Sequence, residues 1–472
     1  MFRRKAAGFG VALAALVTDP VRPIGAEAFS FDGQAIPSPL QMKVYQAFYV
    51  YATSDAAERR YPHPMITEDL MLIPDTSSLG SQAYPSAGIP ELQAYRSLQM
   101  LVIPQKHFFS LVDPAGFCGY GTDQSPVLSL RRNISGAVLR TITTLRQEHV
   151  EAMLPETGVY LLVISNCGNL SSARITGTAS VRNPHGYLPA TEYHKIGFWG
   201  ATILIYILLV AFWGALVLKD WSNLLALQKE LLVVCLLGVA ESIIMLKLYL
   251  TWNEQPDFPE LLFLFGSVAS SWKTCVMIRL ALNAGEAVED LPFWTSTTTA
   301  ALLVAYAVAD FRFRSTLRFR ASYSLQFQDV LWNAMPVTLM FAVLLLLSGN
   351  ALMRRASDMT SSYSPLRAPL FNASVIILGC GGVGAVIALV LQTLDYTCGE
   401  DSTMWRLHFL MSDGLPQAVF VPGLCAAMVV WRPTDATRVD GKVPPPAPSC
   451  EDAELVGVAL DGDAEAASMP AE

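Results

Sequence analysis

Seven apolar segments, each long enough to cross a bilayer, constrain the fold of this chain more than any other feature. A hydrocarbon core about 30 Å thick requires about 20 apolar residues in one helix. We therefore expect a membrane protein whose seven-helix bundle occupies residues 196–433. The seven segments are residues 196–218, 230–252, 260–283, 294–310, 328–350, 368–394 and 404–431.

The overall composition agrees with this class. Hydrophobic residues make up 52% of the 472 positions and charged residues 15%, whereas soluble proteins carry about 25% charged residues. The net charge is −8. No run of Lys and Arg is dense enough to follow a phosphate backbone, so a nucleic-acid partner is not expected.

No motif predicts catalysis or a cofactor. The sequence lacks a Ser/His/Asp arrangement, a metal-spaced cluster and a phosphate loop in a context that could assemble one, so we expect no enzyme. The glycine cluster at residues 379–384 resembles a dinucleotide-binding loop only superficially, because no strand precedes it. Apolar residues flank this cluster, and a close helix contact or a local kink is the better interpretation.

Residues 1–28 have the features of a secretory signal peptide. Three basic residues at positions 3–5 precede an apolar run at 6–17, and Ala26 and Ala28 form a small-residue cleavage pattern. An N-terminal anchor helix is the alternative. Two glycosylation acceptors, Asn133 and Asn169, favour translocation of the domain that follows.

Residues 29–186 are expected to form a luminal antiparallel β-sandwich, joined to the bundle by a connector at 187–195. The domain is rich in Tyr, Val, Ser, Thr, Pro and Gly, and turn residues separate its short β-type runs. Such runs at this spacing favour a sandwich over alternating strands and helices. The clearest runs are residues 42–51, 98–103, 160–165 and 174–181.

Cys118 and Cys167 are the two cysteines of this domain, and an oxidising lumen favours a disulfide between them. Closing a loop of about 50 residues would contribute roughly 3 to 4 kcal/mol. Neither cysteine has a metal-type neighbour at short spacing. The predicted topology also places Cys398 outside, where it could compete for a partner.

An odd number of spans puts the two termini on opposite sides of the membrane. The tail at residues 434–472 is then cytosolic, and its acidic, aromatic-free composition predicts disorder. A short sorting motif in this tail is the alternative to a solvated segment. The basic residues of the loops follow the positive-inside tendency, except in the connection between the fourth and fifth segments.

Ionisable residues inside the apolar segments are the leading functional candidates, because each costs about 2.5 to 3.5 kcal/mol at a helix centre unless it is paired or hydrated. Glu241 and Lys273 lie about 16 and 15 Å from the inner ends of consecutive helices, so we expect them to be in contact. Asp413 lies about two turns closer to the lumen, where it is expected to face an outward-opening cavity with His408 above it. The polar residues could act as packing elements, or they could line a hydrated cavity for a ligand, a membrane lipid or an ion.

Two motifs before the first helix resemble a known family. Residues 158–168 read GVYLLVISNCG, and residues 183–190 read NPHGYLPA and lead directly into the bundle. A Gly-x-Tyr strand ending in Asn-Cys and a Gly-Tyr-Leu-Pro connector are typical of the GOLD-domain, or lung, seven-transmembrane family. The chain most resembles its transmembrane protein 87 branch. Further matches include Gly238 with Glu241, residues 267–273, Asp413 and residues 431–434.

The resemblance implies a GOLD-like luminal sandwich on a seven-helix bundle, resident in Golgi and endosomal membranes with a cytosolic C-terminus. It implies a non-enzymatic role in retrograde transport from endosomes to the trans-Golgi network, with cargo, a luminal protein or lipid as the partner. The alternatives that it leaves open are a cation channel and a ligand-activated receptor that use the polar cavity of the bundle.

Overall fold

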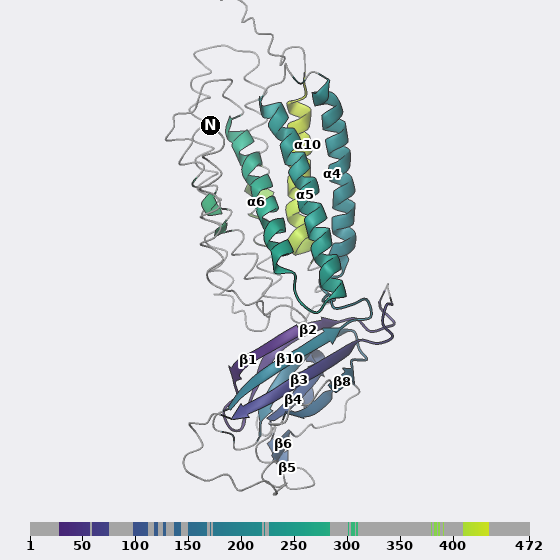
Figure 1. The fold of residues 1–472 in the computed structure, drawn as a ribbon, viewed down its shortest axis with the longest axis vertical. Helices are drawn as coiled ribbons and strands as arrows, with labels where there is room; N and C mark the ends of the chain where they lie inside the picture. The colour runs from purple at the N-terminus through teal and green to yellow at the C-terminus, as the bar shows by residue number, and fades with distance from the viewer. Residues whose placement is uncertain are drawn as a thin grey trace, which may run out of the picture.

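The computed structural model has an elongated shape, with a β domain at one end and parallel rows of helices at the other (Figure 1). Residues 1–27 of the predicted signal peptide, both glycosylation acceptors, Cys398, His408 and the predicted tail lie outside the described residues, while Ala28 begins β1. The structure describes residues 28–56, 59–74, 98–111, 118–120, 126–128, 136–142, 150–167, 170, 173–219, 221, 226–283, isolated positions within 301–309 and 379–390, and 409–433.

The β domain contains two four-stranded antiparallel sheets, in the orders β1-β10-β3-β8 and β2-β9-β4-β7, and a two-stranded sheet of β5 and β6. Three of the four runs named from the sequence lie within one strand, and the run at 42–51 extends one residue past the end of β2. The strands are β1 (Ala28–Ala35), β2 (Gln41–Val50), β3 (Met65–Pro74), β4 (Leu98–Pro104), β5 (Cys118–Tyr120), β6 (Pro126–Leu128), β7 (Val138–Ile142), β8 (Val150–Met153), β9 (Gly158–Asn166) and β10 (Ala173–Arg182), with helix α3 at Gln105–Leu111 after β4.

The sequence of strand β9 is a continuous apolar run and lacks the alternation of apolar and polar residues that is typical of a strand with one exposed face. Successive side chains of a strand point to opposite faces of its sheet. Leu162 and Ile164 enter the core that the two large sheets share, while Leu161 and Val163 pack on the other face with Phe108 of α3. Apolar residues therefore cover both faces of this sheet. Strand β9 places apolar side chains on each face, so its sequence does not alternate between apolar and polar residues.

The Asn-Cys motif at the end of β9 closes the domain in two ways. Cys167 forms the predicted disulfide with Cys118, with a Cα–Cα distance of 5.3 Å. The buried Asn166 amide donates to the carbonyl oxygens of Pro37 at 2.8 Å and Leu170 at 2.9 Å. The motif thus ties β9 to the segments before β2 and after the disulfide.

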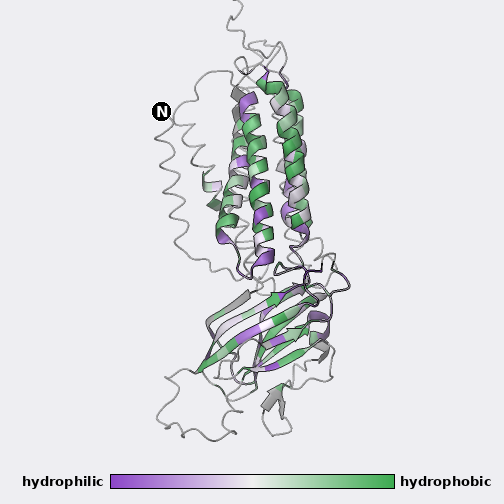
Figure 2. Ribbon diagram, turned by 45° about the vertical axis from the view of Figure 1, so that its right-hand side comes forward, coloured by the Kyte–Doolittle hydropathy of each residue, from purple (hydrophilic) through white to green (hydrophobic). Residues whose placement is uncertain are grey.

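The helices run side by side, away from the β domain (Figure 1), and hydrophobic residues predominate along them (Figure 2). Residues of all four long helices form a common apolar core. The helices are α4 (His194–Leu218), α5 (Ala226–Glu254), α6 (Glu260–Asn283) and α10 (Leu415–Val430), which the π-helical turn η6 (Leu410–Gly414) precedes.

Within the described part of the chain, three helices are long and apolar enough to cross a membrane: His194–Leu218, Gln228–Glu254 and Ser412–Val430. Helix α6 has a similar length but carries buried serines and Lys273. The segments predicted at 294–310, 328–350 and 368–394 are described only at scattered helical positions. Among these positions, Gly384 packs so closely on α10 that a Cβ would overlap the Val419 side chain, the type of helix contact expected for the glycine cluster.

The end of the bundle remote from the β domain is tied by Gln228 of α5. Its amide donates to the carbonyl oxygen of Trp431 at 3.0 Å, and its own carbonyl oxygen accepts from the Trp213 indole at 3.0 Å. Helices α4, α5 and α10 are therefore joined at this end by one hydrogen bond from the Gln228 side chain and one to its backbone carbonyl.

Candidate functional site

Glu241 of α5 and Lys273 of α6 are in contact, as the depth argument predicts. Nζ of Lys273 lies 2.5 Å from Oε2 of Glu241, and both side chains are at most 2% exposed. Helices α5 and α6 are consecutive and packed against each other, which brings two residues of equal depth together. The contact neutralises two charges that would otherwise be buried alone.

Two further side chains complete this polar centre, and neither was singled out from the sequence. The Lys273 ammonium donates to the Tyr206 hydroxyl of α4 at 3.0 Å and to Oε1 of Gln417 in α10 at 3.3 Å. Tyr206 donates to the same Gln417 oxygen at 2.9 Å, and Gln417 returns its amide to Glu241 at 3.3 Å. One ring of polar contacts thus joins all four described helices.

Apolar groups enclose this ring. The Lys273 ammonium lies 4.3 Å from the Phe420 ring centroid and 5.1 Å from that of Tyr206, within the range of cation–π attraction. Gly238 of α5 lets the Tyr206 ring approach, because a Cβ at that position would overlap the ring. The arrangement can hold a charge pair and four helices in one geometry.

Among the described residues Asp413 faces a cation, and the outward-opening cavity expected beside it is not seen. The residue is 7% exposed, and its Oδ2 lies 2.6 Å from Nζ of Lys195 at the start of α4. Lys195 also pairs with Glu192 at 2.8 Å. The first helix therefore supplies a cation close to the depth predicted for Asp413. The two opposite charges form a buried ion pair.

The carboxylate of Asp413 belongs to η6, where the chain makes a π-helical turn before α10. Such turns widen a helix locally and are frequent at functional sites. Gln417 follows four residues later. One face of this segment therefore contributes both to the Asp413–Lys195 ion pair and to the polar centre around Lys273. His408, expected above Asp413, lies outside the described residues.

The connector motif builds the junction between the β domain and the bundle. Gly186 has a φ of +147°, and a Cβ there would overlap the backbone oxygen of Asn253 in α5. The Tyr187 amide donates to that oxygen at 3.0 Å, and the Asn253 side-chain amide donates to the His185 carbonyl at 2.9 Å. A side chain at Gly186 would push these groups apart.

Asn183 and His185 hold the connector against the β domain. The Asn183 amide donates to the Leu188 carbonyl at 3.2 Å, and its oxygen accepts from the Tyr51 backbone at 3.0 Å. Nε2 of His185 donates to the same Leu188 carbonyl at 2.9 Å. His185 is 1% exposed, and its ring lies 4.1 Å from that of Tyr193.

Burial controls the protonation of His185. Desolvation lowers the pKa of its imidazole to about 4, with the His194 ring acting in the same direction and the hydrogen bond to Leu188 opposing it. The ring is therefore neutral at physiological pH. His185 is therefore a buried histidine of the junction core.

Tyr51 and His194 make a direct contact between the β domain and the first helix. The Tyr51 hydroxyl and Nε2 of His194 are 3.0 Å apart, and the His194 ring lies 5.6 Å from that of Phe409, just before η6. Residues of the β domain, α4 and the last helical segment therefore meet in one chain of contacts.

The described residues contain no group of three or more His, Cys, Asp or Glu side chains placed to hold a metal ion. The polar contacts described above are buried ion pairs and hydrogen bonds. Some of the missed residues had a signal in the sequence: Gln417 is a lone amide in an apolar segment, and Lys195 is a cation at a helix start. Tyr206 had none, because an aromatic residue in a membrane helix is common.

These observations define the class of the protein: an integral, multi-pass membrane protein with an N-terminal antiparallel β domain joined to a helical bundle. Residues 194–438 match the family model described as "GOST, seven transmembrane domain", which covers more than half of the chain. The chain belongs to this family. The family predicted from the connector motifs is thereby confirmed, and the assignment to one branch stays a prediction.

The chain is also similar to the "Membrane protein PTM1" of Saccharomyces cerevisiae (strain YJM789). The two sequences are 22% identical over 301 residues, which cover 60% of this chain and 56% of the relative. The chain thus spans just over half the length of this relative.

Proposed function

We propose that this protein acts in membrane trafficking, in retrograde transport from endosomes to the trans-Golgi network, and has no catalytic activity. In this proposal it belongs to the transmembrane protein 87 branch and crosses Golgi and endosomal membranes seven times. Its β domain is a GOLD-like module on the luminal side and binds cargo, and its C-terminal tail is cytosolic.

The junction carries this proposal. Tyr51 of the β domain contacts His194 of α4 at 3.0 Å, and the connector binds Asn253 at the end of α5. A β domain fixed to two membrane helices by buried polar contacts is suited to pass a binding event into the bundle. A domain on a loose linker would leave no such route.

The test is a knockout of the gene with rescue by variants. We expect the knockout to missort a cargo protein that normally recycles through the Golgi, and the wild-type chain to restore it. Gly186→Val should fail to restore sorting, because its side chain meets Asn253. Tyr51→Phe removes only the hydroxyl contact with His194 and should restore it partly.

Arg174→Ala is the matched control, since this exposed side chain lies on β10 and the change leaves the junction intact. Tagged protein must reach the same compartment in every variant. A clean knockout with normal cargo distribution contradicts the proposal.

A cation channel is the second candidate, and the buried Glu241–Lys273 pair at the centre of the bundle favours it. Intramembrane ionisable residues commonly mark ion or proton pathways. The purified protein in planar bilayers should then conduct, with a conductance altered by Lys273→Met. Silent bilayers containing well-folded protein would contradict this candidate.

A further inference from the structure

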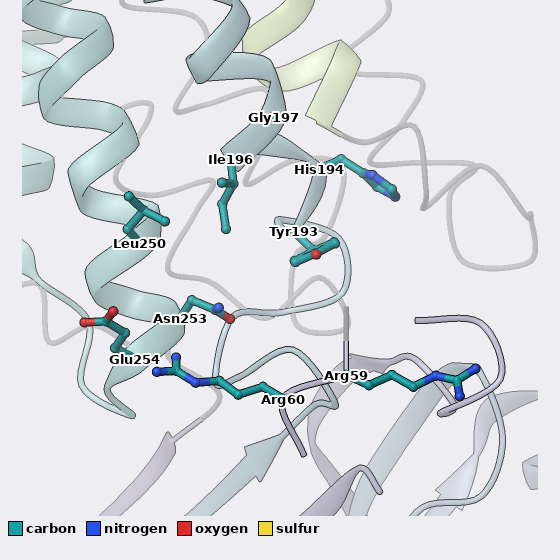
Figure 3. A pocket seen from close by; sticks show the side chains of 9 residues that line it. All are labelled: Arg59, Arg60, Tyr193, His194, Ile196, Gly197, Leu250, Asn253 and Glu254. Atoms are coloured by element: carbon teal, nitrogen blue, oxygen red, sulfur yellow. The ribbon is translucent and has the colours of Figure 1, made fainter. Parts of the chain in front are cut away.

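A pocket of about 690 Å³ lies where the β domain meets the ends of α4 and α5 (Figure 3). Its volume falls within the range of small-molecule sites, about 300 to 1,000 Å³. It is separate from the polar centre of the bundle and shares none of its residues. The lining residues are Arg59, Arg60, Tyr193, His194, Ile196, Gly197, Leu250, Asn253 and Glu254.

The β-domain side of the pocket is cationic. Arg59 and Arg60 extend in opposite directions along it, with Arg60 pointing toward Glu254 (Figure 3). No ion pair joins either guanidinium group to another described residue, and both side chains are exposed. Two arginines against one glutamate leave a net positive charge, which favours an anionic group.

The loop that carries the two arginines is fixed in place. The backbone amides of Arg60 and Tyr61 both donate to the Pro184 carbonyl at 2.8 Å. The Arg182 guanidinium lies 4.4 Å from the Tyr61 ring centroid. The guanidinium groups are therefore presented by an anchored segment, which reduces the entropy lost when they bind a ligand.

The bundle side of the pocket combines the polar residues His194, Asn253 and Glu254 with Ile196 and Leu250, and Leu250 continues into an exposed, mainly apolar face of α5. Exposed apolar residues run along this helix from Val233 to Leu250, a distance of about 26 Å at the helical rise. This length is close to the hydrocarbon thickness of about 30 Å. Leu250, which lines the pocket, then lies at the hydrocarbon boundary, and Glu254 lies about one turn beyond it.

We propose that this pocket binds the headgroup of a phospholipid from the adjacent leaflet, with its phosphate at Arg60, with Arg59 adding positive charge to the same wall, and with its acyl chains along Leu250 and Ile196. Arginine suits this role because its planar guanidinium pairs with phosphate through two hydrogen bonds. The pocket joins a cationic loop to the apolar residues Leu250 and Ile196 at the depth where phosphate and acyl groups meet. This inference does not depend on the trafficking role.

The experiment measures thermal unfolding of the purified, delipidated full-length protein in detergent against ligand concentration. The probe is dioctanoylphosphatidylglycerol. Dioctanoylglycerol lacks the phosphate, and glycerol 3-phosphate lacks the acyl chains. A ligand that binds only the folded state stabilises it by an amount that grows with the logarithm of one plus the ratio of ligand concentration to Kd, and we expect the phospholipid to give the largest rise in unfolding temperature.

Arg59→Ala with Arg60→Ala should weaken the apparent affinity for the phospholipid at least about tenfold, because charge-assisted hydrogen bonds are lost. Arg174→Ala, an exposed arginine of the β domain outside the pocket, should leave the affinity unchanged. If the alanine pair fails to fold, Arg59→Gln with Arg60→Gln removes the charges while keeping polar side chains.

Three results would overturn the proposal. The first is an unchanged phospholipid affinity in the double variant. The second is an equal response to dioctanoylglycerol, which would remove the role of the phosphate. The third is an equal response to glycerol 3-phosphate, which would assign the site to a soluble phosphate compound and not to a lipid.

Discussion

Nζ of Lys273 on α6 lies 3.0 Å from the hydroxyl oxygen of Tyr206 on α4, so a polar contact joins two helices that each pack against α5. The same ammonium contacts Glu241 and Gln417. A lysine has three protons to donate, and three acceptors surround this one. The Lys273 ammonium therefore links the helices at the centre of the bundle and has an acceptor for each of its three protons.

Lys273→Met should destabilise the protein strongly. The change leaves Glu241 buried without its cation, and breaking a buried ion pair from one side costs about 3 to 5 kcal/mol. Chemical denaturation of the purified protein in detergent measures the loss. Adding Glu241→Gln should recover part of it, because the uncompensated charge disappears.

Lys247→Met is the control for that series, since Lys247 is exposed on the same helix as Glu241. Its stability should stay close to wild type. Equal losses for Lys247→Met and Lys273→Met would contradict the special role of the buried pair.

Asp413→Asn should cost less, about 1 to 3 kcal/mol, because Lys195 keeps Glu192 as a second anion at 2.8 Å. Glu192→Gln combined with Asp413→Asn should cost more than the sum of the two single changes, since Lys195 then loses both anionic partners. The same denaturation assay provides the double-mutant cycle. Strict additivity would show that the two carboxylates act on Lys195 independently.

Acid should weaken the junction through His185. Burial lowers the pKa of this ring from 6.5 to about 4, so the folded state binds a proton less readily than the unfolded state. The contribution to stability is complete above pH 6.5 and is lost as the pH falls toward 4, with a total of about 3 kcal/mol. Unfolding of the full-length protein between pH 7.5 and 4 measures this loss.

His185→Gln should flatten the pH dependence, because its amide can still donate to the Leu188 carbonyl but does not titrate. A slope unaffected by the change at His185 would exclude this residue as its source.

Glu68 on β3 should have the opposite effect on the pH dependence of stability: its contribution should be lost as the pH rises. Desolvation raises the pKa of its carboxyl group to about 7, although the Arg140 charge partly offsets the effect. The folded state therefore binds a proton more tightly than the unfolded state. The favourable contribution is present below pH 4.5 and is lost as the pH rises through 7.

Glu68→Gln should raise stability at pH 8 and change it little at pH 5. Unfolding of the full-length chain at the two pH values measures the difference. Glu151→Gln on the neighbouring strand β8, where the side chain is exposed, is the matched control. A loss of stability at pH 8 for Glu68→Gln would contradict the protonation argument.

Much of the architecture could be predicted because it depends on patterns along the chain. Strand β9 and helices α4, α5 and α6 follow the predicted segments closely, since apolar length and turn residues are local properties. The Cys118–Cys167 pairing followed from the small number of cysteines. The Glu241–Lys273 contact followed from equal depth on adjacent helices.

The ion-pair partner of Asp413 was not predicted, because it comes from the first helix, which is distant in the sequence. Depth along one helix could be estimated, but the direction of the side chain could not. Lys195 is at the start of α4, and only the packing of α4 beside η6 and α10 brings the two residues within 2.6 Å.

A membrane protein with a β domain before its helices can be predicted from the chain alone, because apolar length and strand periodicity are local and strong. The positions of the charges that a bilayer would penalise can be read in the same way. The groups that neutralise these charges, the need for glycine at position 186 and the pocket between the arginine loop and Leu250 become visible only in the packed structure. Those relationships depend on distances of about 3 Å between residues far apart in the chain, and such distances are set only when the helices and sheets pack.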